Sequence, residues 1–275
     1  MLNIFKMDMH RLKHSKIFYV AIIFITIMAV ALVMSGMSTT MEGLLGVVDP
    51  NAAAPSFVIP EGSGMAAAES AGAGGDAFMT GMMGAGVVFI LLSIILSVFV
   101  CGDYSGGFAN NIFTAHSNPW DYIGGKMLSM ATVSGFLLIL YTVESMISLS
   151  FFGYGVALSG GVIGLIFFLI EKWLLSCALS AVILLVNVFT RNVAWGIVAG
   201  FLIATGGLTM GISLLAGFFN LDWLISVFSV TISGSSQICT LAFDGLILLR
   251  VVLASVAWIF VGCFASRKVL KTKDI

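Results

Sequence analysis

Six long apolar runs constrain this chain more than any other feature of its sequence. Each has about 18 residues or more, enough for a helix rising 1.5 Å per residue to cross the roughly 30 Å hydrocarbon layer of a membrane. The runs cover residues 17–37, 84–101, 128–152, 161–189, 193–218 and 245–266. They predict an all-α polytopic membrane protein with six transmembrane helices, organised as a single transmembrane domain over residues 1–275.

The composition excludes a soluble fold. Hydrophobic residues make up 60% of the 275 positions and charged residues 9%, whereas an ordinary soluble domain has about a quarter charged residues. The 12 basic residues are spread over several short segments and build no single patch. The sequence therefore gives no indication of a nucleic-acid partner.

The positions of the basic residues predict the orientation of the chain. Cytoplasmic segments of membrane proteins carry an excess of Lys and Arg. In this chain such residues lie before the first run, after the second and fourth runs, and after the last run, at Lys6, Arg11, Lys13, Lys16, Lys126, Arg191, Arg267, Lys268, Lys271 and Lys273. We therefore expect both termini to be cytoplasmic, in a multi-pass protein of the cell (cytoplasmic) membrane.

Residues 38–80 form a large predicted outer loop. This stretch is rich in Gly, Ala and Pro, holds five acidic residues and contains no Lys or Arg. A solvated loop is the favoured interpretation. The alternative is an acidic outer lip that concentrates a cationic substrate.

Residues 1–16 predict an amphipathic helix lying in the membrane interface. An apolar face is formed by Leu2, Phe5, Met9 and Leu12, opposite Lys6, His10 and Lys13. A frayed basic tail is the alternative. A cleaved secretory signal is disfavoured, because the apolar run that follows is longer than the roughly 7–15 residues of a signal's hydrophobic region.

Two segments fit the span pattern less well than the others. The run at 161–189 is long for one crossing, so its helix either protrudes on the outer side or begins in the interface. Residues 219–244 contain an apolar centre that is too short to cross the membrane. We expect 219–244 to be an outer or re-entrant segment.

Small residues recur at helical spacing in the fifth run. Gly196, Gly200 and Ala204 lie four residues apart on one face, where a second helix can approach closely. This face serves either packing within the subunit or a contact between two subunits.

Four ionisable residues lie inside the predicted spans, where a charge is costly. Glu144 and Arg250 lie at similar depths near the outer side, which predicts an ion pair between them. A role in binding substrate or protons, and snorkelling of Arg250 to the surface, are alternatives. Glu171 and Lys172 are neighbours in sequence and point about 100° apart on a helix, so we expect them to have different partners.

The sequence contains no pattern for a catalytic or metal site. Gly125 and Lys126 are followed by Met127, and Trp120 stands where the first glycine of a Walker motif belongs, so the chain cannot hydrolyse nucleotide by that route. The histidines all lie on the predicted cytoplasmic side, and the four cysteines have no CxxC spacing. We therefore assign no catalytic residue, no metal ligand and no enzymatic activity to this chain.

The connection at 102–127 is the most informative polar segment. An acidic residue follows the second run, then a glycine, a pair of apolar residues, a proline turn and a Gly-Lys pair before the third run, at Asp103, Gly107, Ile112, Phe113, Pro119, Gly125 and Lys126. In these positions the chain resembles the membrane (permease) subunits of ABC-2 type transporters. It departs from the family at Phe108, where Thr is common, and at Trp120 and Asp121, where a basic residue is common.

The resemblance implies a function in export. Such a permease forms half of a transport pathway and pairs with a second permease subunit, as a homodimer or heterodimer. Cytosolic ABC ATPase subunits would bind ATP and Mg and act on the cytoplasmic coupling loop at 102–127, so this chain itself would hold no cofactor. The expected substrate is hydrophobic or amphipathic, such as an antimicrobial peptide. An ion-coupled secondary carrier and a non-transporting scaffold or sensor are the alternatives.

Overall fold

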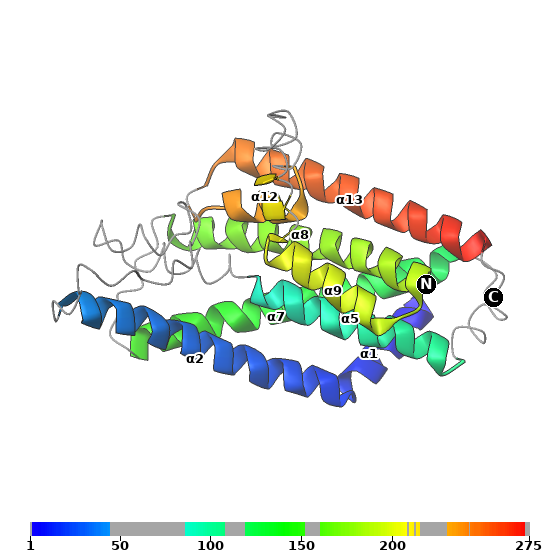
Figure 1. Ribbon diagram of the computed structural model, residues 1–275, viewed down its shortest axis with the longest axis horizontal. Helices are drawn as coiled ribbons and strands as arrows, with labels where there is room; N and C mark the ends of the chain where they lie inside the picture. Colours follow the sequence, from blue (N-terminus) through cyan, green and yellow to red (C-terminus); the bar gives the residue numbers. More distant parts are fainter. Residues whose placement is uncertain are drawn as a thin grey trace.

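The computed structural model describes residues 2–44, 86–107, 119–151, 160–207, 209–211, 213–214, 230–241 and 243–272, which are almost entirely helical and contain no strand. The long helices run side by side along one axis, and both termini lie at the same end of the bundle (Figure 1). In chain order the helices are α1 (Leu2–Lys13), α2 (Lys16–Leu44), α5 (Val87–Ser105), α7 (Pro119–Phe151), α8 (Gly161–Thr190), α9 (Val193–Ala204), α12 (Ile232–Ile238) and α13 (Gly245–Thr272).

Local sequence signals explain where these helices start and stop. Helix α5 ends before two glycines, and Gly107 adopts a positive φ of 67°, a conformation that favours glycine. Helix α7 starts with Pro119, whose missing N–H costs nothing in the first turn. The side chains of Asn192 and Asp244 accept hydrogen bonds of 2.9 Å from the first turns of α9 and α13.

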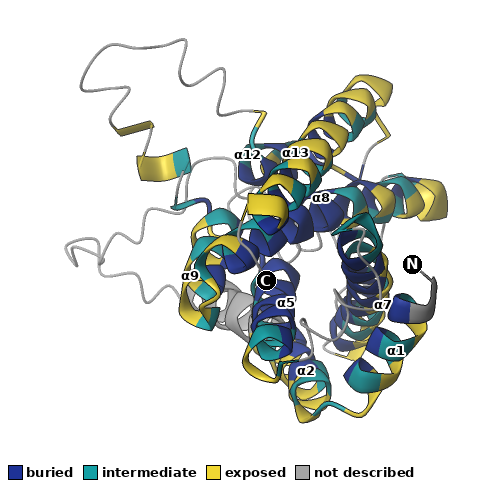
Figure 2. Cartoon of the chain, turned by 90° about the vertical axis from the view of Figure 1, so that its right-hand side faces the viewer, coloured by how far each residue is buried: buried dark blue, intermediate teal, exposed yellow. Residues whose placement is uncertain are grey.

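Helix α8 is the centre of the bundle. It packs against α5, α7, α9, α12 and α13. It is mostly buried from Leu175 to Val188, whereas its first turns are largely exposed. The outward faces of α2, α9 and α13 are exposed and apolar (Figure 2). Exposed residues of this kind, such as Ile23, Trp195 and Leu253, are typical of a surface that faces lipid.

The apolar helices account for four or five membrane spans within the described part of the chain. Helices α5, α7, α8 and α13 are each long and apolar enough to cross, and α1 with α2 adds a fifth if this bent pair counts as one span. The chain is therefore an all-α, multi-pass membrane protein. Six spans remain a prediction.

The predicted fifth span, 193–218, is wrong as a single helix. Helix α9 has 12 residues and ends at Ala204, because a turn follows at Thr205 and Gly206 with a φ of 72° at the glycine. Helical residues follow at 207, 209–211 and 213–214. At 1.5 Å per residue, α9 covers about 18 Å, which is less than a membrane crossing.

Three further boundaries differ from the predicted ones. Helix α2 continues to Leu44, seven residues into the predicted outer loop 38–80, whose remainder lies outside the described residues. Helix α5 continues to Ser105 and α7 begins at Pro119, so both ends of the predicted loop 102–127 are helix. Helix α8 is unbroken over 30 residues despite its internal charges. Within 219–244, the seven-residue helix α12 packs on α8 and α13.

The small residues of α9 pack inside the chain and cannot form a subunit contact. A Cβ added at Gly196 would collide with Asn187 and Ser97, and one added at Gly200 would collide with Ser93. Both glycines and Ala204 are buried against α5 and α8. The alternative of a dimer contact through this face is therefore wrong, because helices of the same chain already fill the space beside it.

The helix termini that carry basic residues lie together at one end of the bundle. Arg11 of α1 contacts the end of α5, and Arg191 after α8 lies 5.2 Å from the ring of Tyr104 in the last turn of α5. Arg267 of α13 lies 5.2 Å from the ring of Trp120 at the start of α7. The grouping matches the expected sidedness of these segments, although the compartment that they face stays a prediction.

We predict that Gly200→Ala lowers the free energy of unfolding by about 1–3 kcal/mol, because the added methyl group overpacks the contact with Ser93. The matched control is Gly102→Ala in α5, where a Cβ meets no described atom within 4 Å. Thermal unfolding in mild detergent, followed by size-exclusion chromatography, measures both effects. Unchanged stability with a smaller amount of dimer in Gly200→Ala would contradict the packing described above.

Candidate functional site

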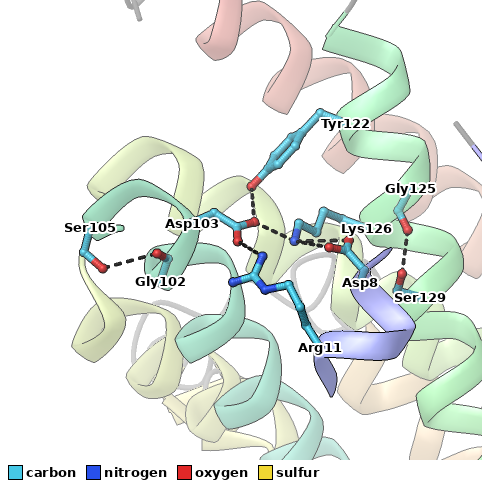
Figure 3. A network of polar contacts seen from close by, with 9 residues as sticks. All are labelled: Asp8, Arg11, Gly102, Asp103, Ser105, Tyr122, Gly125, Lys126 and Ser129. Carbon is cyan, nitrogen blue, oxygen red and sulfur yellow. Dashed lines mark hydrogen bonds and ion pairs between the residues drawn. The ribbon is translucent and has the colours of Figure 1, made fainter. Parts of the chain in front are cut away.

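Four charged side chains meet at the end of the bundle where the termini lie. Asp8 and Arg11 come from α1, Asp103 from the last turn of α5, and Lys126 from the third turn of α7 (Figure 3). Their heads point toward one another, and the ring of Tyr122 reaches the same point from α7. We call these five residues the ion cluster.

Lys126 lies at the centre of the ion cluster. Its Nζ is 2.5 Å from Oδ2 of Asp103 and 3.1 Å from both carboxylate oxygens of Asp8. Arg11 donates to Oδ1 of Asp103 at 2.8 Å, and the Tyr122 hydroxyl donates to its Oδ2 at 3.4 Å. The cluster thus joins three helices that are separate in sequence.

Mutual neutralisation allows these charges to be buried. Asp8, Asp103 and Lys126 have no exposed surface, and an isolated charge in such a place would cost several kcal/mol. Two carboxylates face two bases, so the formal charges cancel. The ring of Phe99 covers the ammonium of Lys126, with 3.8 Å between Nζ and the ring centroid, and adds a cation–π contact.

Burial works against the charged form of Asp8 in the ion cluster. Burial raises the pKa of its carboxyl above the ordinary value, while the nearby ammonium of Lys126 acts in the opposite direction. The charge of Asp8 therefore depends on Lys126 remaining beside it.

Two of the predicted coupling residues, Asp103 and Lys126, are brought together in this cluster. They lie in helices and are buried, which corrects the prediction of an open cytoplasmic loop at these positions. Gly107 and Pro119 mark the end of α5 and the start of α7. Ile112 and Phe113 lie outside the described residues.

Sequence reasoning missed Asp8 and Tyr122. The buried positions of α1 are Ile4, Asp8 and Leu12, whereas Phe5 and Met9 of the predicted apolar face are half-buried. A signal was present in the sequence. Asp8 is the one acidic residue among the first 16 positions and shares the spacing of four residues with Ile4 and Leu12.

The two neighbouring charges of α8 have different partners, as expected. Lys172 is buried and donates to Ser236 of α12, at 2.7 Å to its carbonyl oxygen and 2.8 Å to its hydroxyl oxygen. Glu171 is buried beside the thiol of Cys239, which follows α12. The contacts of Lys172 and Glu171 hold the short helix α12 against α8.

Glu144 has a different partner from the expected Arg250. Its Oε1 accepts a hydrogen bond of 2.8 Å from the hydroxyl of Thr26 in α2, whereas Arg250 lines a groove with Val230 and Leu253 on the α13 side of the bundle. Helices α2 and α13 lie on opposite sides of the bundle (Figure 2). The predicted ion pair is therefore replaced by a contact that joins α7 to α2.

The sequence matches none of the protein-family models and none of the curated proteins with which it was compared. Within the described residues, no group of three or more His, Cys, Asp or Glu side chains is arranged to hold a metal ion.

We predict that Lys126→Met lowers the free energy of unfolding by about 3–5 kcal/mol, because it leaves two carboxylates buried without their central base. Lys268→Met, at an exposed position near the same end, is the matched control. Thermal unfolding in mild detergent measures both variants. If Lys126→Met gives no folded protein, adding Asp103→Asn should recover part of the yield. Equal stability of the two single variants would show that the cluster contributes little.

Proposed function

We propose that this chain is the permease subunit of an ATP-driven ABC exporter in the cytoplasmic membrane. Separate cytosolic subunits would bind ATP and Mg and dock on the segment that joins α5 to α7. The proposal is supported by the order of motif residues from Asp103 to Lys126, by the apolar spanning helices, and by the absence of a Walker motif from the sequence.

The ion cluster is the observation that carries this proposal. Asp103 and Lys126 stand at the two edges of the proposed docking segment, and they contact each other directly. An ATPase that pushes on this segment would therefore move the ends of α5 and α7 together. Because Asp8 and Arg11 bind the same two residues, α1 would move with them.

Helix α1 would transmit this movement to α2, a wall of the proposed transport pathway. It meets α2 at a bend of 62°, with His14 and Ser15 between the two helices. A shift of α1 at the membrane surface would tilt α2, which packs on α7 and bonds to Glu144 there. A rigid junction at one end and a bend beside it are elements of a hinge movement.

A hydrophobic or amphipathic substrate, such as an antimicrobial peptide, fits the chemistry of the chain. Most buried polar groups inside the bundle are small hydroxyls, including Ser93, Ser97, Ser134 and Ser180, rather than charges. The acidic residues of 38–80 would favour a cationic substrate on the outer side. A second permease subunit would complete the pathway.

The pair Glu171 and Lys172 favours one alternative, an ion-coupled secondary carrier, since buried ionisable residues within spans are typical of such carriers. The energy source separates the two functions. Transport that requires ATP and a copurifying ATPase supports the exporter, and transport that follows an ion gradient without ATP supports the carrier.

We predict that replacing Ile112 and Phe113 by Asp uncouples ATP hydrolysis from transport and leaves thermal stability unchanged, because these residues would form the apolar contact with the ATPase. Lys268→Asp with Lys271→Asp is the control, since it places two acids at the same end of the bundle on α13. Transport and ATP hydrolysis are measured together in proteoliposomes that contain the copurified ATPase. Full transport by the Ile112 and Phe113 variant would contradict this docking site.

A further inference from the structure

A cavity of about 430 Å³ lies where α1 bends into α2, against the last turns of α5. Helix α2 packs mainly on α7 and makes few contacts with α5. Space therefore remains between α2 and α5, beside the ion cluster. Figure 2 views the bundle from this end, with α1, α2 and α5 toward the viewer.

One part of the cavity wall is polar and basic. It is formed by His10, Arg11 and His14 of α1 and the bend. The two imidazole rings stack with 4.4 Å between their centroids, and Nδ1 of His14 lies 2.9 Å from the carbonyl oxygen of His10. The side chain of Arg11 remains 37% exposed although it is paired with Asp103.

The other part of the wall is apolar and lies on the membrane side of the bend. Phe18 of α2 and Val98 and Phe99 of α5 are among its residues. Just beyond them, α2 exposes Tyr19, Val20 and other large apolar side chains, as a helix in contact with lipid does. A molecule in this cavity would thus meet basic groups at one end and a hydrocarbon-like surface at the other.

The surrounding charge is positive. The ion cluster is neutral as a whole, since Asp8 and Asp103 balance Arg11 and Lys126. The exposed bases Lys6, Lys13 and Lys16 remain on α1 and at the start of α2, without an acid other than Asp8 in the first 16 positions. Basic groups at a membrane surface attract anionic headgroups.

We propose that this cavity binds one anionic phospholipid. The headgroup phosphate lies against His10, Arg11 and His14, and an acyl chain runs along Phe18 and Phe99. The amphipathic wall matches a phospholipid better than a soluble anion, because a soluble anion has no apolar part to contact the apolar half. The bound lipid fills the space between α2 and α5 and holds α1 at the membrane surface. This proposal does not depend on the exporter function.

Native mass spectrometry of the detergent-purified protein tests the site, with phosphatidylglycerol and phosphatidylcholine of the same acyl chains as probes. The protein should retain one phosphatidylglycerol at least about tenfold more tightly than phosphatidylcholine, because each basic group near the surface contributes about fivefold and more than one lies near the cavity. Equal retention of the two lipids would overturn the proposal.

Two variant pairs locate the lipid. Val98→Trp fills the cavity and should abolish tight binding, whereas Ile139→Trp on the exposed face of α7 should keep it. Lys13→Gln with Lys16→Gln should weaken binding about tenfold or more, whereas Lys268→Gln with Lys271→Gln makes the same charge change on α13 and should not. If Val98→Trp fails to fold, the two double charge variants decide whether the lipid site exists. Equal weakening of phosphatidylglycerol binding by both double variants would show attraction to the protein surface without a site.

Inorganic phosphate at millimolar concentration is the last arm of the experiment. The lipid site predicts that phosphate leaves bound phosphatidylglycerol in place, because it cannot occupy the apolar wall. Displacement of the lipid by phosphate would instead show a site for a soluble anion and would overturn the assignment of a lipid.

Discussion

The contact of one buried ammonium with two buried carboxylates holds this end of the structure together. Lys126 has no exposed surface and reaches Asp103 and Asp8 at 2.5 and 3.1 Å. None of the three charges is stable there alone, because burial removes the water that would solvate it. The positions of α1, α5 and α7 are therefore linked. The segment between α5 and α7 starts and ends beside the ion cluster.

The rest of the bundle depends on close packing of small residues around α8. Lipid tails are as apolar as the helix surfaces, so helices associate in a membrane through packing and hydrogen bonds rather than through the hydrophobic effect. Gly196 and Gly200 bring α9 onto α5 and α8, and Gly262 brings α13 onto Ala181 of α8. Asn187 of α8 donates to Ser97 of α5 at 3.2 Å in the same layer. These contacts fix the bundle to which the helices of the ion cluster belong.

Much of the architecture was predictable from the sequence, because long apolar runs have few structural solutions. The start of α8 and of α13 and the helical N-terminal segment agree with the predicted ranges. The break after α9 was not predicted, since Thr205 and Gly206 stand in a run that is apolar overall. A turn of this kind is set by glycine conformation and by the closeness of α12, where Ser233 and Gln237 would meet a Cβ at position 206.

The candidate site was half predictable. Asp103 and Lys126 stood out by their motif, whereas Asp8 resembled a surface residue until α1 was seen packed on α7. The partner of Glu144 was missed because Thr26 carries no charge in an apolar run.

A double-mutant cycle between Asp8 and Lys126 tests the central claim most directly. The free energy of unfolding in mild detergent is measured for the parent protein, Asp8→Asn, Lys126→Met and the double variant. If the ion cluster joins α1 to α7, the two changes are coupled by about 1–3 kcal/mol, because the loss of one partner already removes most of what the other contributes. Additive effects, within about 0.5 kcal/mol, would contradict the account, since they would mean that α1 is held to the bundle without the contact between these two charges.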